Sequence, residues 1–132
     1  MLLDTNAFIW FVDGNERLKA PMRAAIGDPS IPVKLSIVSF WEMAIKHRKG
    51  KLLLPAPFAA DPALALEHWC ARAVIDVIGV EARHIDRAMS LAFPHDDPFD
   101  RLIAATALTE DLELVTSDAR FSRCPGLRVL KV

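Results

Sequence analysis

The sequence predicts an α/β fold with a mainly parallel central sheet. Short apolar runs alternate along the chain with longer segments whose apolar residues recur at helical spacing. Strands that alternate with helices usually lie parallel, with the helices packed on the sheet. The chain has 132 residues, 52% of them hydrophobic, which is enough for a core without metal or disulfide staples. Because no repeat or linker interrupts it, we expect residues 1–132 to form a single domain.

The first part of the chain is expected to contain two strands and three helices. The segment Gly27-Asp28-Pro29 ends the second helix, and Gly50 ends the third. Either Ser36 or Ser39 can cap this third helix, because a serine hydroxyl accepts a hydrogen bond from the free N–H groups of a first turn. The strands are expected at residues 2–3 and 31–35, and the helices at 7–12, 17–26 and from Ser36 or Ser39 to Arg48.

The rest of the chain is expected to add three helices and three strands. Two prolines within residues 52–58 indicate a loop. Asp61 can then cap a helix that has Pro62 at its favoured first position. A polar turn over residues 93–98 separates the last two helices. The helices are expected at residues 62–72, 81–91 and 99–109, and the strands at 74–77, 113–116 and 127–130.

The charge balance and the cysteine content exclude several classes of protein. The 16 basic and 17 acidic residues give a formal net charge of −1, which excludes a disordered polyelectrolyte and a generally basic nucleic-acid coat protein. Cys70 and Cys124 are too few and too far apart for a disulfide framework or a zinc site. No secretion signal or membrane-spanning run of about 20 apolar residues is visible. We therefore expect a soluble protein of the reducing cytoplasm, without a membrane partner.

Four acidic residues are expected to meet at one edge of the predicted sheet. Asp4 follows the first strand, and Glu42 lies in the first turns of the helix after the second strand. Asp100 begins the last helix, and Asp118 follows the strand to which that helix leads. Parallel strands end where their return helices begin, and ligands bind at that edge. Converging carboxylates suit Mg²⁺ or Mn²⁺, which can orient a phosphate and activate water for phosphodiester cleavage.

Each of these acids also has a purely structural explanation, because carboxylates favour helix N-termini. Asp4 or Thr5 can cap the first helix, and Ser39–Glu42 has the spacing of a capping box. Asp97 can cap the last helix, and Asp118 can cap the turn that follows it. Capping alone does not explain why four acids collect at one edge, but periodicity does not distinguish the two explanations.

Four segments resemble, in their order along the chain, the successive motifs of PIN-domain ribonucleases. They are Leu2–Asn6, Ser39–Lys46, Asp97–Ala105 and Leu114–Asp118. The set is most similar to the toxin component of VapBC-type toxin–antitoxin pairs and extends over nearly the whole chain. The resemblance implies a PIN-like three-layer α/β/α fold with a mainly parallel sheet of four to five strands.

The resemblance also implies a chemistry and a set of site residues. The family's four metal-binding acids correspond to Asp4, Glu42, Asp100 and Asp118. The positions that would support them are Thr5, Asn6, Asp97 and Thr116. The implied reaction is hydrolysis of RNA phosphodiester bonds by an endoribonuclease that uses Mg²⁺, with Mn²⁺ as a substitute.

Several basic residues near these acids are candidate contacts for RNA phosphates, namely Lys46, Arg48, Lys49 and Arg101. Such contacts position RNA without reading its sequence. The basic run that begins at Lys46 also suits a helix C-terminus, and Lys46 is four residues from Glu42, so the two can pair. His95 is a lone loop histidine, which we expect to be solvated rather than a metal ligand.

The resemblance further implies a homodimer and a small antitoxin partner that covers the active site, with a basic side chain near the acids. Aromatic residues of the first and third predicted helices are expected in the core or a subunit interface rather than as base-stacking platforms. They are Trp10, Phe11, Phe40 and Trp41.

Two other functions compete with the nuclease. A phosphatase with an aspartate nucleophile at Asp4 would usually carry a second acid two residues later, where this chain has Asn6. A non-catalytic interaction module with a degenerate site is opposed by the complete acidic set.

Overall fold

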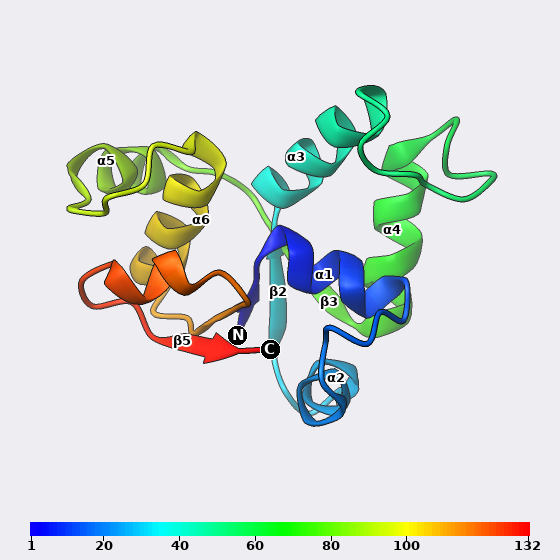
Figure 1. Cartoon of the computed structure of the whole chain (residues 1–132), viewed down its shortest axis with the longest axis horizontal. Coiled ribbons are helices and arrows are strands. Elements are labelled where there is room, and N and C mark those ends of the chain that lie inside the picture. The colour runs from blue at the N-terminus through cyan, green and yellow to red at the C-terminus, as the bar shows by residue number, and fades with distance from the viewer.

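A computed structural model describes all residues, 1–132, as a five-stranded sheet with helices on both faces (Figure 1). Every neighbouring pair of strands is parallel, in the order β3-β2-β1-β4-β5. The strands are β1 (Leu2–Leu3), β2 (Val33–Ser36), β3 (Ile75–Ile78), β4 (Leu114–Thr116) and β5 (Val129–Lys131). The predicted α/β/α architecture, with a parallel sheet of four to five strands, is confirmed.

Six α-helices and one 3₁₀ helix connect the strands. They are α1 (Thr5–Val12), α2 (Ala20–Gly27), α3 (Ile37–Arg48), α4 (Pro62–Ala73), α5 (Ala82–Ser90), α6 (Pro98–Thr109) and η1 (Ala119–Arg123). None of the helices has the length and apolar character needed to cross a lipid bilayer.

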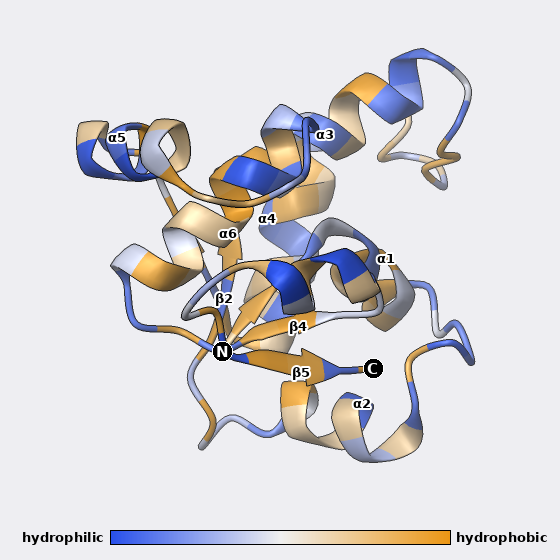
Figure 2. Ribbon diagram, turned by 60° about the vertical axis from the view of Figure 1, so that its left-hand side comes forward, coloured by the Kyte–Doolittle hydropathy of each residue, from blue (hydrophilic) through white to orange (hydrophobic).

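The sheet separates two apolar clusters, because successive side chains of a strand point to opposite faces. Leu2 belongs to the cluster formed with α6 and η1, whereas its neighbour Leu3 belongs to the cluster formed with α1, α2 and α4. On β4, Leu114 and Val115 divide in the same way. Figure 2 shows the hydrophobic residues along these strands. The double coverage explains why the strands are short continuous apolar runs rather than alternating ones.

Local capping moves several element boundaries from their predicted positions. The helix α1 begins at Thr5, two residues earlier than predicted, because Asp4 accepts a hydrogen bond from the backbone N–H of Ala7 at 2.6 Å. Val74, predicted to start a strand, has φ of 54° and ends α4 in the left-handed conformation. Such a φ is uncommon for a β-branched residue, and β3 starts only at Ile75.

The cap of α3 decides between the two predicted serines. Ser36 accepts a hydrogen bond from the N–H of Val38 at 3.2 Å, so α3 begins at Ile37. Ser39 lies inside the helix and is fully buried, so the capping box between Ser39 and Glu42 is wrong. Glu42 therefore lies in the second turn of α3, where its side chain is free to serve a site.

Candidate metal centre

The predicted acids gather in one pocket at the ends of β1 and β4, beside α3 and the start of α6. The cavity has a volume of about 210 Å³ and is lined by five carboxylates but only two cationic side chains. The lining residues are Asp4, Thr5, Asn6, Glu42, Lys46, Asp97, Asp100, Asp118, Arg120 and Phe121. The structure thus brings together Asp4, Glu42, Asp100 and Asp118 from four separate segments.

Asp4 is the most deeply buried of these carboxylates, with 5% of its surface exposed. Its Oδ1 accepts from the N–H of Ala7, and its Oδ2 accepts from the hydroxyl of Thr116. The Thr116 oxygen in turn accepts from the N–H of Asp118 at 3.0 Å, so it joins the acids of β1 and β4. Burial is the main cause that raises the pKa of Asp4, and the two hydrogen bonds partly oppose it.

Glu42 is held between two side chains. Its Oε2 accepts from the Thr5 hydroxyl at 2.5 Å, and its Oε1 lies 2.6 Å from Nζ of Lys46. The pair with Lys46 has the i,i+4 spacing that the sequence predicted. Lys46 therefore fixes Glu42 while its ammonium lies at the wall of the pocket.

Asp97 and Asp100 take different positions at the start of α6. Asp97 is the cap, since its Oδ1 accepts from the N–H groups of Phe99 at 2.9 Å and Asp100 at 3.4 Å. Asp100 lies in the first turn and faces the pocket. Burial, followed by the negative charge of Asp97, raises the pKa of Asp100 to about 6. The nearest guanidinium nitrogen, Nη2 of Arg120, is 3.8 Å from its Oδ2 and does not offset these two effects.

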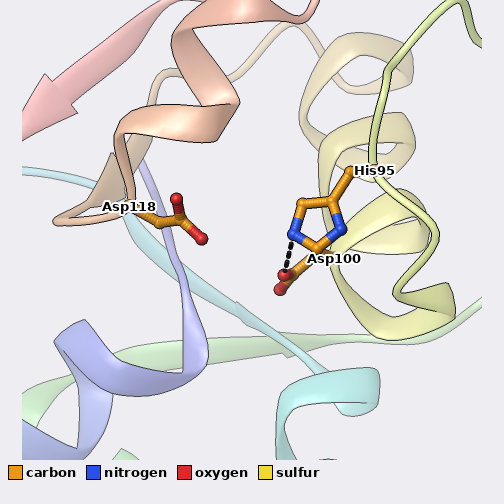
Figure 3. A group of neighbouring side chains, drawn as sticks. All are labelled: His95, Asp100 and Asp118. Carbon is orange, nitrogen blue, oxygen red and sulfur yellow. Dashed lines mark ion pairs between the residues drawn. The ribbon is translucent and has the colours of Figure 1, made fainter.

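His95 lies against Asp100, contrary to the expectation that it is solvated (Figure 3). Only 8% of its surface is exposed, and its ring packs near those of Phe93 and Phe121. Its Nε2 is 2.8 Å from Oδ2 of Asp100, but the ring N–H is not aligned for a hydrogen bond, so the contact is electrostatic. The prediction failed because the apolar partners of His95 come from distant parts of the chain or depend on how the turn folds.

The tautomer of His95 argues against a direct metal bond. Its Nδ1 accepts from the backbone N–H of Asp97 at 3.2 Å, which assigns the ring proton to Nε2. A protonated Nε2 has no lone pair for a cation, although it favours the charged form of Asp100. His95 is thus placed to support the carboxylate.

Arg120 is a pocket residue that the sequence analysis missed. The backbone N–H of Arg120 donates to Oδ1 of Asp118 at 2.9 Å, which caps η1 as predicted for that acid. The side chain also folds back, with Nε 2.8 Å and Nη2 2.5 Å from Oδ2 of Asp118. These bonds hold the pKa of Asp118 below its ordinary value. The position of Arg120 two residues after Asp118 was the available signal.

Arg101, predicted as an RNA contact, makes structural contacts that the sequence did not indicate. Its Nη1 donates to the carbonyls of Phe93 at 2.6 Å and His95 at 3.3 Å, and its Nη2 donates to those of Ala88 and Leu91, both at 2.8 Å. These bonds occupy both terminal nitrogens and attach the segment before α6 to the helix.

The other predicted RNA contacts differ in their distance from the acids. Arg48 and Lys49 are exposed at the end of α3 and do not line the pocket. Lys46, one turn earlier, does line it.

The donor set fits a hard divalent cation. Carboxylate oxygens are the ligands that Mg²⁺ and Mn²⁺ prefer. Asp100 and Asp118 each place a carboxylate oxygen within 4.8 Å of the other, and Figure 3 shows His95 beside them, where it supports Asp100 rather than supplying a ligand. Burial, together with the neighbouring carboxylates, raises the pKa values of Asp4 and Asp100, and a bound cation would offset both effects.

Comparison with known proteins places this geometry in a family. The PIN domain family model matches residues 1–127. The chain belongs to the PIN domain family. The family expected from the motifs is therefore confirmed, and the pocket is the acidic pocket of a PIN domain.

Solved structures with the same fold come from toxin–antitoxin complexes. VapBC2 from Rickettsia felis, bound to a DNA fragment from its promoter, superposes with a TM-score of 0.71 at 17% identity, covering 98% of this chain and 96% of that chain. VapBC-1 from nontypeable Haemophilus influenzae superposes with a TM-score of 0.72 at 19% identity, covering 98% of this chain and 96% of that chain. FitAcB from Neisseria gonorrhoeae superposes with a TM-score of 0.69 at 23% identity, covering 98% of this chain and 95% of that chain. The comparison with curated proteins found no significant match.

Proposed function

We propose that this PIN domain is a Mg²⁺-dependent endoribonuclease, with Mn²⁺ as a substitute, and the toxin of a VapBC-type pair. The observation that carries the proposal is the convergence of Asp4, Glu42, Asp100 and Asp118 on one pocket of a PIN domain. The structural similarity to VapBC complexes supports the toxin assignment. We further propose that residues 1–132 act as one domain in the cytoplasm, where the free thiols of Cys70 and Cys124 stay reduced.

The pocket divides the work among its side chains. A bound divalent cation would supply Lewis acidity for the hydrolysis of a phosphodiester bond. Asp4, Glu42 and Asp100 would hold it, and Asp118 would complete the set directly or through water. The surrounding contacts fix these carboxylates before any ligand arrives, which lowers the cost of assembling the site. The residues that make these contacts are Thr5, Thr116, Lys46 and His95.

RNA would approach along the basic end of α3. Lys46 lies at the pocket, and Arg48 and Lys49 continue the positive charge beyond it. These side chains can contact phosphates on either side of the cleaved bond, which positions the strand without reading its bases.

The proposed partners are a small antitoxin and a second copy of the chain. A basic side chain of the antitoxin would be attracted into this pocket, because five carboxylates line it. The second copy would cover an apolar surface on α3, α5 and α6 that includes Trp41, Ile85 and Met89, all exposed in the single chain.

The deciding experiment is an RNA cleavage assay with purified protein. Cleavage should require Mg²⁺ or Mn²⁺, stop with EDTA and fall by at least about 100-fold in Asp4→Asn and Asp100→Asn, because the amide keeps the shape and loses the charge. Asp86→Asn, at an exposed carboxylate of α5, is the matched control and should cleave normally.

Two results would reject the nuclease assignment. Hydrolysis of p-nitrophenyl phosphate without RNA cleavage would favour an aspartate-nucleophile phosphatase. RNA or protein binding with no hydrolysis under any metal would favour a non-catalytic interaction module.

A further inference from the structure

Arg120 has an unusual position at the mouth of the acidic pocket. Its Nε and Nη2 face Asp118, and Nη2 also lies 3.8 Å from Oδ2 of Asp100. Its Nη1 has no hydrogen-bond or ion-pair partner in the protein, and the side chain is 57% exposed. One edge of the guanidinium is thus fixed while the other is free.

Lys46, the second cation of the pocket, does not have one bound edge and one free edge. Its ammonium is a point charge 2.6 Å from Glu42, on a flexible stem. A guanidinium is a planar fork with five donors, so it can hold a carboxylate on one edge and a phosphate oxygen on another. The anchor on Asp118 restricts the rotamers of Arg120, which reduces the entropy lost when its free edge binds.

The charge of the pocket favours a fixed cation at its mouth. Five carboxylates line the pocket, so a phosphate group that approaches meets strong repulsion unless fixed cations face it. Arg120 faces both the carboxylates and solvent, and its anchor, Asp118, is itself a proposed member of the metal centre.

We infer that Arg120, held by Asp118, binds a phosphate oxygen of the RNA at the mouth of the metal centre. The inference rests on the proposed function and names a residue that positions its substrate. Asp118 would then have two roles, because it orients Arg120 toward the RNA and also belongs to the proposed metal centre. The competing role is that of a counter-ion, in which Arg120 only neutralises Asp118 when the cation is absent.

RNA binding without cleavage separates these two roles. In an Asp4→Asn background, the affinity for a single-stranded oligoribonucleotide is measured by fluorescence anisotropy with Mn²⁺ at several salt concentrations. Arg120→Met should weaken binding about tenfold, since a charge-assisted hydrogen bond is lost. The slope of log affinity against log salt should fall by about 0.7, the value for one phosphate contact on a single strand.

Two control variants and one further readout complete the test. Arg123→Met removes the same charge from an exposed position of η1 that does not line the pocket, and it should change the affinity by less than about twofold. Arg120→Lys should bind RNA more tightly than Arg120→Met but less tightly than the parent, because lysine keeps the charge and lacks the planar set of donors. The Mn²⁺ affinity of the single variant Arg120→Met, measured by electron paramagnetic resonance without RNA, should rise at most slightly, because the positive charge that pairs with Asp118 is removed.

Equal RNA affinity of Arg120→Met and its parent overturns the inference. A changed Mn²⁺ affinity with unchanged RNA binding also overturns it, because that result assigns Arg120 to the counter-ion role. If the wild type does not cleave RNA and Asp4→Asn does not bind it, the proposed function is rejected, and this inference with it.

Discussion

At the residue scale, Asp97 and Asp100 share one helical turn but make different contacts. Asp97 caps α6, and replacing a cap with alanine typically costs about 0.5–2 kcal/mol. Asp100 is a crowded carboxylate whose removal relieves repulsion from its neighbours. Asp97→Ala should therefore lower the free energy of unfolding of the metal-free protein and keep part of the activity. Asp100→Ala should be neutral or stabilising without metal and inactive with it.

Thermal melts with and without Mn²⁺, paired with the cleavage assay, test this pair of variants. Mn²⁺ should raise the melting temperature of Asp97→Ala but not that of Asp100→Ala. The reversed pattern would transfer the ligand role to Asp97.

The pKa of Asp100 makes the metal-free stability depend on pH. The folded pKa of about 6 exceeds the ordinary value of 3.8, so the folded protein holds the proton more tightly than the unfolded chain. This stabilising contribution is complete below pH 3.8 and is lost as the pH rises through about 6. Relative to Asp100→Asn, the wild type should lose roughly 1–2 kcal/mol of unfolding free energy between pH 4 and pH 7, less than the full shift implies because solvent screens this partly exposed carboxylate.

Urea unfolding of the wild type and Asp100→Asn in EDTA across this pH range measures the difference between their unfolding free energies. Contributions from groups that titrate alike in both proteins cancel in this difference. A difference that stays constant with pH would contradict the raised pKa. In the same range, Mn²⁺ affinity of the wild type should increase with pH, because the cation competes with the proton on Asp100.

At the scale of elements, Arg101 attaches the segment between α5 and α6 to α6. Four backbone carbonyls accept from its terminal nitrogens, and the last of them belongs to His95. Arg101→Met should lower the free energy of unfolding by about 2–4 kcal/mol, because partly buried carbonyls lose charge-assisted bonds. It should also weaken Mn²⁺ binding, since His95 then loses its fixed position beside Asp100.

Arg128→Met is the matched control for this variant. Arg128 pairs with Asp111 at 2.8 Å, but both side chains are largely exposed, so its loss should cost less than about 1 kcal/mol. Equal melting temperatures of the two variants would show that the carbonyl contacts of Arg101 do not hold the segment.

The sequence predicted those elements and site residues whose signals are local. Asp61 and Asp97 each precede a proline at the first helical position, and both are caps in the structure. The four acids were expected at one edge because parallel strands end where their return helices begin, and the resemblance to PIN-domain ribonucleases identified them as a metal-binding set. The pairing of β1 with β4, which brings Asp4 and Asp118 together, is seen only in the structure. The burial of His95 and the carbonyl contacts of Arg101 were not predicted, because the partners of both depend on how residues 88–95 pack against α6, which no local pattern encodes.

At the scale of the whole molecule, an apolar surface crosses three helices. Trp41 of α3 packs edge-on against Phe99 of α6, with ring centroids 5.2 Å apart, and remains 61% exposed. Met89 and Ile85 of α5, 80% and 51% exposed, flank a groove of about 190 Å³ beside α6. Exposed apolar side chains gathered on neighbouring helices often mark an interface, which favours the homodimer.

We therefore expect the wild type to sediment as a dimer at micromolar concentration and the double variant Ile85→Glu with Met89→Glu to sediment as a monomer. Two buried carboxylates per subunit would have to lose their hydration in the interface, and each costs several kcal/mol. Leu53→Glu is the control, because Leu53 is 87% exposed in the loop before α4 and lies outside this surface; it should remain dimeric. Circular dichroism melts verify that all variants are folded, as the exposed positions of Ile85 and Met89 lead us to expect. A monomeric wild type, or a dimeric double variant, would show that this surface does not join two copies of the chain.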